Sequence, residues 1–356
     1  MTSRERVLGA LRREPIDRVP IHDSPWFTAV ERWHKEGLPP DTTPEEYFGY
    51  EFAASSADLS LQLSRETIEE TDDYIVVRNA NGAIEMNFKA ATSTPEYRGF
   101  TITSRQVWNE HRDRYTYNDS RIDTDKGLAG NQAAHQRGMF CNYGAAIGYD
   151  RTQGIVGSEN LLMAMATEPD WAEEMFAMGI DLAIKAGEAM HRAGYHFDGV
   201  FVYDDNGYRN TTLFSPDMYR RLLMPHHARL CRWAHEHNWP VLLHSCGCVR
   251  DRVGDFIEAG FDCLQPLEVK AGMDLIALKR KYGDRLSFMG GIDVRCMSHP
   301  DPAVIEREIA EKLAVAKQGS GYIYHSDHSV PDDVSFQQYQ RVIELVRQHG
   351  RYDGDA

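Results

Sequence analysis

The chain has 356 residues, of which 42% are hydrophobic and 26% are charged, and its formal net charge at pH 7 is -15. This composition is typical of a globular protein with a large core, and the acidic balance argues against nucleic-acid binding. No apolar run approaches the ~18 residues of a membrane span, and the charged N-terminus differs from a signal peptide, so we expect a cytoplasmic protein without a membrane partner.

The N-terminal third mixes helical and strand patterns. Residues 3–13 predict a helix, Val19 to Ile21 a short strand, and the signature Thr43 to Glu46 predicts the start of a helix within residues 43–66. Residues 71–118 contain β-rich runs around the turn sequence "NANG", which indicates a hairpin. We therefore predict one domain over residues 1–356, with a β-hairpin-rich insertion, a small antiparallel excursion, at about 71–118.

From about residue 160, strand and helix patterns alternate regularly. Apolar strand patterns occur at 199–205, 240–246, 262–268, 286–293 and 322–328, and each is followed by a helical pattern. Alternation of this kind implies parallel βα units. Five consecutive units favour an α/β fold of the (β/α)8 TIM barrel type, and a doubly wound open sheet is the alternative.

Each of the five predicted strands ends in polar side chains. In a TIM barrel, catalytic groups gather at the carboxyl ends of the strands. These ends read "YDD" at 203–205, "HSC" at 244–246, "QPLE" at 265–268, "GGID" at 290–293 and "HSDH" at 325–328. One polar residue after a strand is commonly a helix N-cap, but five polar strand ends on one rim indicate a functional site.

His244 and Cys246 are the strongest metal-ligand pair in the sequence. Residues two apart on a strand point to the same side, and imidazole nitrogen and thiolate sulfur both suit Zn2+. A zinc site needs at least one more ligand, and His328 lies on the same rim at the end of the last strand. Two packed core residues beside a turn are the alternative. Cys141, by contrast, has no ligand spacing and is predicted to be a packed thiol, as are Cys231 and Cys296.

The strand "VFVYDD" also predicts which of two neighbouring carboxylates is functional. Val200, Val202 and Asp204 share one side of the strand, and small β-branched residues suit barrel interiors. We therefore expect Asp204 to face the barrel mouth and Asp205 to serve as a loop or cap residue. The alternatives are that both carboxylates are structural or that the strand twists and brings Asp205 inward.

Five segments resemble the uroporphyrinogen decarboxylase superfamily, which contains that decarboxylase and the corrinoid-dependent methyltransferases. They occur in the family's order and read "RERVLGALRREPIDRVP", "SPDMYRRLLMPHH", "HSCG", "FMGGID" and "GYIYHSDHSVPDDVS". The resemblance runs over nearly the whole chain, and it implies a (β/α)8 barrel and an enzyme.

The two branches of this superfamily differ in the first strand region. The decarboxylase binds its polycarboxylate substrate with arginines in a motif of the type RxPVWxMRQAGR. The corresponding stretch, Arg18 to Trp26, lacks the two downstream arginines and contains the acidic Asp23. The resemblance is therefore closer to the methyltransferase-like branch. We expect His22, Asp23, Trp26 and Tyr203 to contribute to substrate binding.

The methyltransferase branch holds zinc with an HxC pair and a distant cysteine. His244 and Cys246 match the pair, and His328 occupies the position of the distant cysteine. The resemblance thus implies a zinc-dependent enzyme that moves a methyl group between a small substrate and a corrinoid. No DxHxxG-type cobalamin motif occurs in the sequence, so we expect the cobalamin on a separate corrinoid protein.

We also expect catalytic groups around the metal. Asp204 would orient a ligand or act as a base, and His325 and Asp327 would support the metal-bound histidines. Homodimers are the family-level expectation.

Two alternatives stand beside this hypothesis. One is a metal-free decarboxylase or lyase acting on a small substrate, with His22, Asp23, Asp204 and His328 supplying proton transfer and orientation. The other is a non-catalytic barrel that binds a corrinoid or small ligand as a partner subunit.

Overall fold

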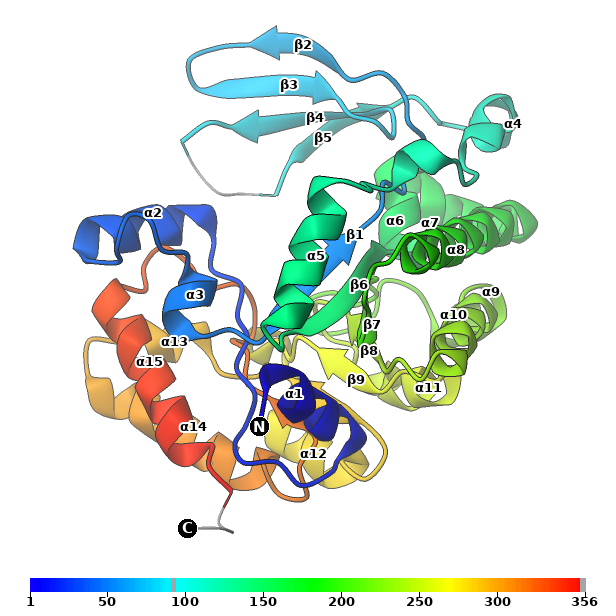
Figure 1. Ribbon diagram of the computed structural model, residues 1–356. Helices are drawn as coiled ribbons and strands as arrows, with labels where there is room; N and C mark the ends of the chain where they lie inside the picture. Colours follow the sequence, from blue (N-terminus) through cyan, green and yellow to red (C-terminus); the bar gives the residue numbers. More distant parts are fainter. Residues whose placement is uncertain (91–93, 353–356) are drawn as a thin grey trace.

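The computed structural model describes residues 1–90 and 94–352, and a sheet of seven parallel strands forms its centre (Figure 1). The strands pair in strictly sequential order along the sheet, unlike the reversing order of a doubly wound sheet. They are β1 (Phe52–Ser56), β6 (Phe140–Ala146), β7 (Gly199–Tyr203), β8 (Val241–His244), β9 (Cys263–Gln265), β10 (Ser287–Met289) and β11 (Tyr322–Ile323). All five strands predicted in the C-terminal half are present.

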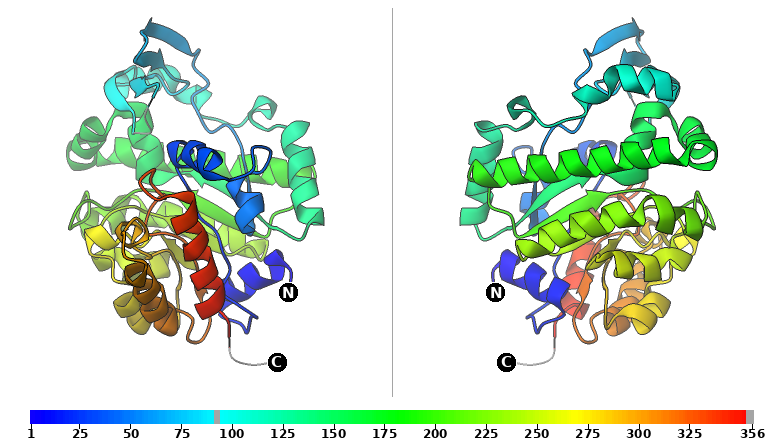
Figure 2. Two further views of the ribbon diagram at one scale, coloured as in Figure 1. Left: turned by 90° about the vertical axis from the view of Figure 1, so that its left-hand side faces the viewer. Right: turned by 90° about the vertical axis from the view of Figure 1, so that its right-hand side faces the viewer.

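Helices connect the strands and surround the sheet (Figures 1 and 2). They are α1 (Ser3–Arg12), α2 (Phe27–Glu36), α3 (Pro44–Phe48), α4 (Arg105–His111), α5 (Lys126–Gln136), α6 (Gly148–Val156), α7 (Ser158–Thr167), α8 (Pro169–Arg192), α9 (Pro216–Leu222), α10 (Met224–Glu236), α11 (Val253–Ala259), α12 (Leu275–Tyr282), α13 (Val294–Met297), α14 (Pro302–Ala316) and α15 (Phe336–His349). Four 3-10 turns lie at Arg112–Arg114, Asp119–Arg121, Arg250–Arg252 and Val269–Ala271. Within the described ranges, no helix combines the length and the apolar character needed to cross a membrane.

Every strand of the central sheet contributes one buried residue to a separate inner cluster. The residues are Phe52, Phe140, Phe201, Leu242, Cys263, Met289 and Ile323. Val7, Ala10 and Leu11 of α1 pack against them, so α1 covers one end of the curled sheet. A much larger cluster lies between the outer face of the sheet and the helices.

A short extended segment lies between the two edge strands of the sheet. The Tyr324 amide donates to the carbonyl of Pro20, and the His22 amide donates to the carbonyl of Tyr324. On the other side, the Glu51 amide donates to the carbonyl of Ile21 at 3.0 Å. The extended segment predicted at 19–21 therefore contacts the chain beside β11 and the chain beside β1.

A second sheet of four antiparallel strands lies beyond the central sheet, at the top of Figure 1. Its strands are β2 (Glu66–Glu70), β3 (Tyr74–Arg78), β4 (Ala83–Phe88) and β5 (Glu96–Phe100). The predicted hairpin joins β3 to β4 through 79–82, where Gly82 has a φ of 82°. The sheet begins at Glu66, five residues before the expected start of the insertion.

The prediction of helical structure throughout residues 43–66 was wrong after Phe48. Thr43 caps α3 as expected, but Gly49 adopts a left-handed φ of 69° and ends the helix. The chain then enters β1 at Phe52, whose side chain packs in the inner cluster. A glycine C-cap therefore outweighs the helical signals further along the chain.

Candidate functional site

Three potential metal ligands converge after β7 and β8, whose ends are neighbours in the sheet. One ligand atom from each of Asp205, His244 and Cys246 lies within 4.8 Å of the other two. His244 Nε2 is 3.1 Å from Cys246 Sγ and 3.5 Å from Asp205 Oδ1. The Cys246 amide donates to the same carboxylate oxygen at 2.7 Å. Imidazole, thiolate and carboxylate are all zinc ligands, and three protein ligands are typical of a catalytic zinc site.

Two glycines allow the loops after β7 and β8 to approach each other. Gly247 has a φ of 76°, and a Cβ at this position would lie 2.6 Å from the Gly207 carbonyl carbon. A Cβ at Gly207 would lie 2.2 Å from the Cys246 carbonyl oxygen. The sequence "HSCG" thus combines a ligand pair with the residue that permits the close loop contact holding Asp205 beside Cys246.

Gln265 at the end of β9 orients the His244 ring. His244 Nδ1 is 2.5 Å from Gln265 Oε1, and this pairing assigns the ring proton to Nδ1. The Nε2 lone pair then faces Cys246 and Asp205. A hydrogen bond from the far nitrogen is usual for metal-binding histidines. Burial lowers the pKa of His244 and favours the neutral form that binds metals.

The surroundings of Cys246 are acidic. Burial raises the pKa of the Cys246 thiol, and the neighbouring Asp205 and Glu268 carboxylates raise it further. Burial and Asp205 also raise the pKa of Asp150 to about 7. Negative charge that opposes formation of a thiolate is offset by a divalent cation. The donor set and its electrostatic environment therefore fit a bound Zn2+ ion.

A cavity of about 190 Å³ adjoins His244. Its lining residues are His22, Ser24, Phe201, Tyr203, His244, Gln265, Pro266, His325, His328 and Ser329. The predicted metal ligand His328 faces this cavity, but it is not part of the three-residue group, in which Asp205 stands instead. Burial lowers the pKa of His328 and favours its neutral form.

Three further residues that we expected at the site also line this cavity. The Tyr203 ring lies 5.2 Å from the His244 ring, between their centroids, and stacks on Phe201. Burial lowers the pKa of His22 to about 3, and its Nδ1 has no hydrogen-bond partner among the described residues. His325 Nε2 is 3.3 Å from the Ser24 hydroxyl oxygen, and its Nδ1 is 2.8 Å from the Ser326 carbonyl.

Asp23 is buried beside this cavity rather than exposed to a substrate. Its carboxylate accepts hydrogen bonds from the hydroxyls of Tyr324, Tyr339 and Ser326 at 3.0, 2.8 and 2.6 Å. Its Oδ1 also lies 3.6 Å from His325 Nδ1. Asp23 therefore positions the loop that carries His325, and its expected role in direct substrate contact does not fit this geometry.

Asp327 and Trp26 are also absent from the described lining of the cavity. The Asp327 carboxylate accepts hydrogen bonds from the amides of Val269 and Val294, and burial raises its pKa to about 6. Trp26 is half-buried at the N-terminus of α2. Asp327 thus ties loops together, and neither residue is placed to contact a ligand in the cavity.

The predicted orientation of Asp204 was wrong. Asp204 is fully buried, with Oδ2 3.0 Å from His227 Nε2 of α10 and Oδ1 accepting from the Asp150 amide of α6. Val200 and Val202 pack in the outer cluster, whereas Phe201 packs in the inner one. In β7 the aromatic side chains face the interior of the curled sheet and the valines face the helices. This is the reverse of the orientation that we expected.

Asp205 is the ligand candidate that the sequence reasoning missed. It shares its strand parity with Phe201 and Tyr203, both of which line the cavity. Recognising these aromatic residues as the inward-facing set would have placed Asp205 on the correct side.

A second, larger cavity of about 480 Å³ lies next to the first. Tyr203 lines both cavities. Ser56 and Ala146 line the larger one from the central sheet, whereas Asn79 and Glu85 line it from the antiparallel sheet and its hairpin turn. The antiparallel sheet therefore forms one wall of the approach to the site.

The comparison with protein families assigns the chain to a family. A family model described as uroporphyrinogen decarboxylase (URO-D) matches residues 152–349, more than half of the chain. The chain belongs to the uroporphyrinogen decarboxylase family. The matched region contains His244, Cys246 and His328.

Relatives of known function come from both branches. A uroporphyrinogen decarboxylase of Pectobacterium carotovorum is 32% identical over 78 residues, a match that spans only 22% of this chain and 22% of that protein. A methylcobamide:CoM methyltransferase of Methanosarcina barkeri is 24% identical over 310 residues, 85% of either chain. The longer match places the chain nearer to the methyltransferase-like branch.

A solved structure has the same fold over its whole length. A methyltransferase from Methanosarcina mazei matches with a TM-score of 0.66 and 17% sequence identity, covering 98% of this chain and 99% of that chain. The likeness establishes the fold of the central sheet and its helices.

Proposed function

We propose that this member of the uroporphyrinogen decarboxylase family is a zinc-dependent methyltransferase. It would move a methyl group between a corrinoid and a small substrate. The observation that carries the proposal is the convergence of Asp205, His244 and Cys246 beside a cavity at the carboxyl ends of the strands. The extent of the match to a methyltransferase supports it.

Asp205, His244 and Cys246 would hold the metal, and hydrogen bonds keep the first two in position. Gln265 holds the His244 ring, and the Cys246 amide holds the Asp205 carboxylate. A bound Zn2+ ion supplies a Lewis acid that lowers the pKa of a thiol or hydroxyl group. The acidic surroundings keep such a site from accumulating excess positive charge.

The cavity residues would bind the substrate. Tyr203 provides an aromatic wall, and His22, His325 and His328 present imidazoles toward the same space. A volume of about 190 Å³ suits a small molecule, and the described lining contains no Arg or Lys to pair with several carboxylates. In this proposal His328 lies on the substrate side and serves to orient the substrate rather than to hold the metal.

We further propose that the chain is one domain, built as a (β/α)8 barrel in which residues 19–22 take the place of the eighth strand. Their hydrogen bonds to both edges of the seven-stranded sheet support this assignment. The antiparallel sheet would be an insertion over the mouth of that barrel. The larger cavity beneath it would form the opening toward which a separate protein presents the face of its corrinoid.

The direct test measures metal content and methyl transfer together. Purified protein should contain about one Zn2+ per chain that is lost in Cys246→Ser, and chelation should remove both that metal and the activity. The assay would supply methylcobalamin with a panel of small thiols and follow the change in corrinoid absorbance. Protein that carries zinc at this site but transfers no methyl group to any thiol or hydroxyl acceptor would argue against the methyltransferase.

A metal-free decarboxylase acting on a small substrate is the second candidate. The observation that favours it is the group of imidazoles of His22, His325 and His328 around one cavity, a suitable set for proton transfer. Carbon dioxide release by metal-free protein, unchanged in Cys246→Ser, would support this candidate over the methyltransferase.

A further inference from the structure

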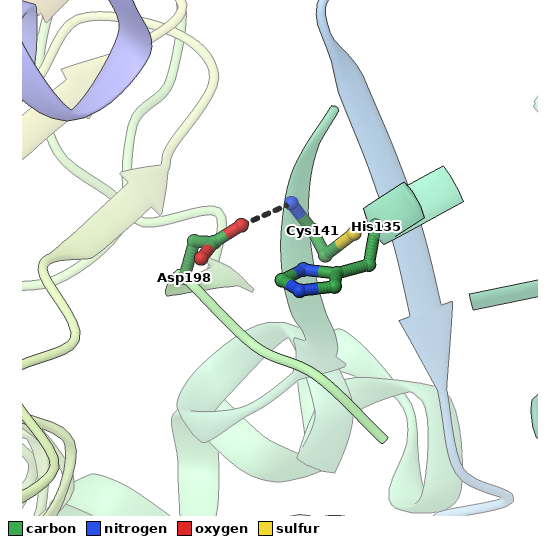
Figure 3. A group of neighbouring side chains, drawn as sticks. All are labelled: His135, Cys141 and Asp198. Carbon is green, nitrogen blue, oxygen red and sulfur yellow. Dashed lines mark hydrogen bonds between the residues drawn. The ribbon is translucent and has the colours of Figure 1, made fainter. Parts of the chain in front are cut away.

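A second group of metal-binding side chains lies at the opposite end of the central strands. One ligand atom from each of His135, Cys141 and Asp198 lies within 4.8 Å of the other two (Figure 3). Cys141 is at the start of β6, Asp198 directly precedes β7, and His135 is in the last turn of α5. Asp198 and Asp205 flank β7, so the two groups are separated by roughly 20 Å of extended chain and cannot share an ion.

We propose that His135, Cys141 and Asp198 form a second transition-metal site of the Zn2+ type, independent of the site at the mouth. Nitrogen, sulfur and oxygen donors together suit Zn2+ among the common biological cations. Bond lengths of about 2.0 to 2.3 Å place tetrahedral ligand atoms about 3.5 Å apart, so the group needs only a small contraction to close on an ion.

The His135 ring has capacity for a new ligand. Its Nδ1 is buried and has no hydrogen-bond partner among the described residues. The His196 ring stacks on it, with 4.1 Å between the ring centroids and 11° between the planes. His196 is exposed and therefore able to rotate, so it offers a second imidazole as a fourth donor.

Hydrogen bonds join the three elements that carry the ligands of this second site. The Asn131 side chain of α5 donates to the His196 carbonyl at 3.0 Å and accepts from the His196 amide at 2.8 Å. The Cys141 amide donates to Asp198 Oδ2 at 2.9 Å. These bonds fix α5, the start of β6 and the loop before β7 against one another before any metal binds.

Arg4 and two backbone carbonyls are the partners that a metal ion at this group would compete with. The Cys141 thiol donates weak hydrogen bonds to the carbonyls of Met139 at 3.8 Å and Asn131 at 4.0 Å, and both end when the thiol loses its proton. The Arg4 Nε lies 2.6 Å from Asp198 Oδ1, and the Arg4 side chain is half exposed. A carboxylate oxygen has two lone pairs, so Asp198 can accept from Arg4 and bind a metal ion together. Arg4 then acts as an outer partner that orients the carboxylate.

The prediction of Cys141 as a packed thiol described its burial correctly but not its neighbours. Cys141 is fully buried, and burial and then Asp198 raise its pKa to about 12. Metal binding would form a bond from Sγ to the ion, break the S–H bond and release that proton to solvent. Sequence spacing gave no sign of the site because its three residues come from separate elements.

The test uses the full chain with the mouth site removed. Metal-free Cys246→Ser protein is titrated with Co2+ and then with Zn2+, and the stoichiometry and the thiolate-to-cobalt absorption are recorded. We expect one ion per chain, a cobalt–thiolate band, and a melting temperature that rises by several degrees with metal. Adding Cys141→Ser should abolish the band.

A paired control keeps this test independent of folding defects. Adding His135→Gln to Cys246→Ser should weaken Zn2+ binding at least tenfold, whereas adding His34→Gln, which changes a remote exposed histidine, should leave it unchanged. The metal-free melting temperatures of these two double variants should agree. Cys246→Ser protein that binds no stoichiometric Zn2+, or an unchanged affinity after His135→Gln, would overturn the second site. Neither outcome depends on methyl transfer.

Discussion

The two ends of the central strands are built differently although they belong to one sheet. At the amino end, α1 packs against the inner cluster and covers it with Val7, Ala10 and Leu11. At the carboxyl end, the strands run into loops that leave cavities of about 190 and 480 Å³. Parallel strands place all their carboxyl ends on one side, so loops from many units can meet there.

The two ends of the strands also differ in which elements supply their potential metal ligands. At the carboxyl end, Gly207 and Gly247 let two loops touch, and Asp205, His244 and Cys246 come from those loops and their strands. At the amino end, the potential ligands come from a helix, a strand start and a loop that Asn131 ties together. The carboxyl-end group opens beside a cavity that His244 itself lines, which is why we assign the chemistry to it. The predictions below test this assignment.

The largest effect is expected from removing a ligand at the carboxyl end. Cys246→Ser should remove the zinc of the mouth site and lower methyl transfer by about 10³-fold or more, because the thiolate is one of only three protein ligands. Zinc content and initial rates are the measurements. Cys296→Ser, a partly exposed cysteine elsewhere, is the matched control and should keep both; equal loss in the two variants would contradict the assignment.

Changing the glycine that allows the loop contact should disrupt the fold of the site. Gly247→Ala puts a Cβ at a left-handed φ and 2.6 Å from Gly207, so we expect a loss of about 3 kcal/mol in the free energy of unfolding. Gly254→Ala in α11 is the control, since its Cβ would meet no described atom within 4 Å. It should be neutral or stabilise by up to about 1 kcal/mol. Denaturant titration separates the two, and similar losses would show that the loop contact is not the cause.

Removing the partner that orients His244 should weaken metal binding without abolishing it. Gln265→Ala deletes the acceptor of the His244 Nδ1 proton, and losing such a partner lowers metal affinity by about 10- to 100-fold. A competition titration with a chelating dye measures the affinity. Gln153→Ala is the control, because Gln153 bonds Asp150 and not His244. An unchanged affinity in Gln265→Ala would mean that the His244 ring does not depend on this bond.

The last effect is a change in how stability depends on pH at the carboxyl end. Burial lowers the pKa of His22 to about 3, whereas an unfolded histidine titrates near pH 6.5. Between these values the unfolded chain binds one proton more, so His22 makes stability fall with decreasing pH by about 1.4 kcal/mol per pH unit. His22→Asn should remove that part of the slope between pH 6 and 4, as measured by urea unfolding. His34→Asn should retain it, and an equal slope in all three proteins would contradict the burial of a neutral His22.

Several features of the fold could be predicted from the sequence because their signals are local. The five C-terminal strands and the hairpin at 79–82 follow from apolar runs and turn residues. The strands β1 and β6 were not predicted, because their sequences "FAASS" and "FCNYGAA" are short, rich in small residues and lack clear alternation. Their strand character comes from pairing with neighbours that lie far away in sequence.

The candidate site could be predicted only in part for the same reason. His244 and Cys246 share one strand end, so their spacing alone brings them together. Asp205 joins them through a loop contact between two units, which no pattern within either unit reveals. The orientation of Asp204 depended on whether aromatic or β-branched residues fill the interior, and here Phe201 fills it.

Zinc affinities of variants at Asp205 and His328 identify the third ligand of the metal site. The comparison uses His135→Gln protein as the reference, because this substitution weakens zinc binding at the second group. Zinc affinity at the mouth site is measured for this protein and for its double variants with Asp205→Asn and with His328→Gln. We expect a large loss of affinity in Asp205→Asn and little change in His328→Gln, because Asp205 and not His328 lies with His244 and Cys246. A large loss in His328→Gln with full affinity in Asp205→Asn would contradict this expectation.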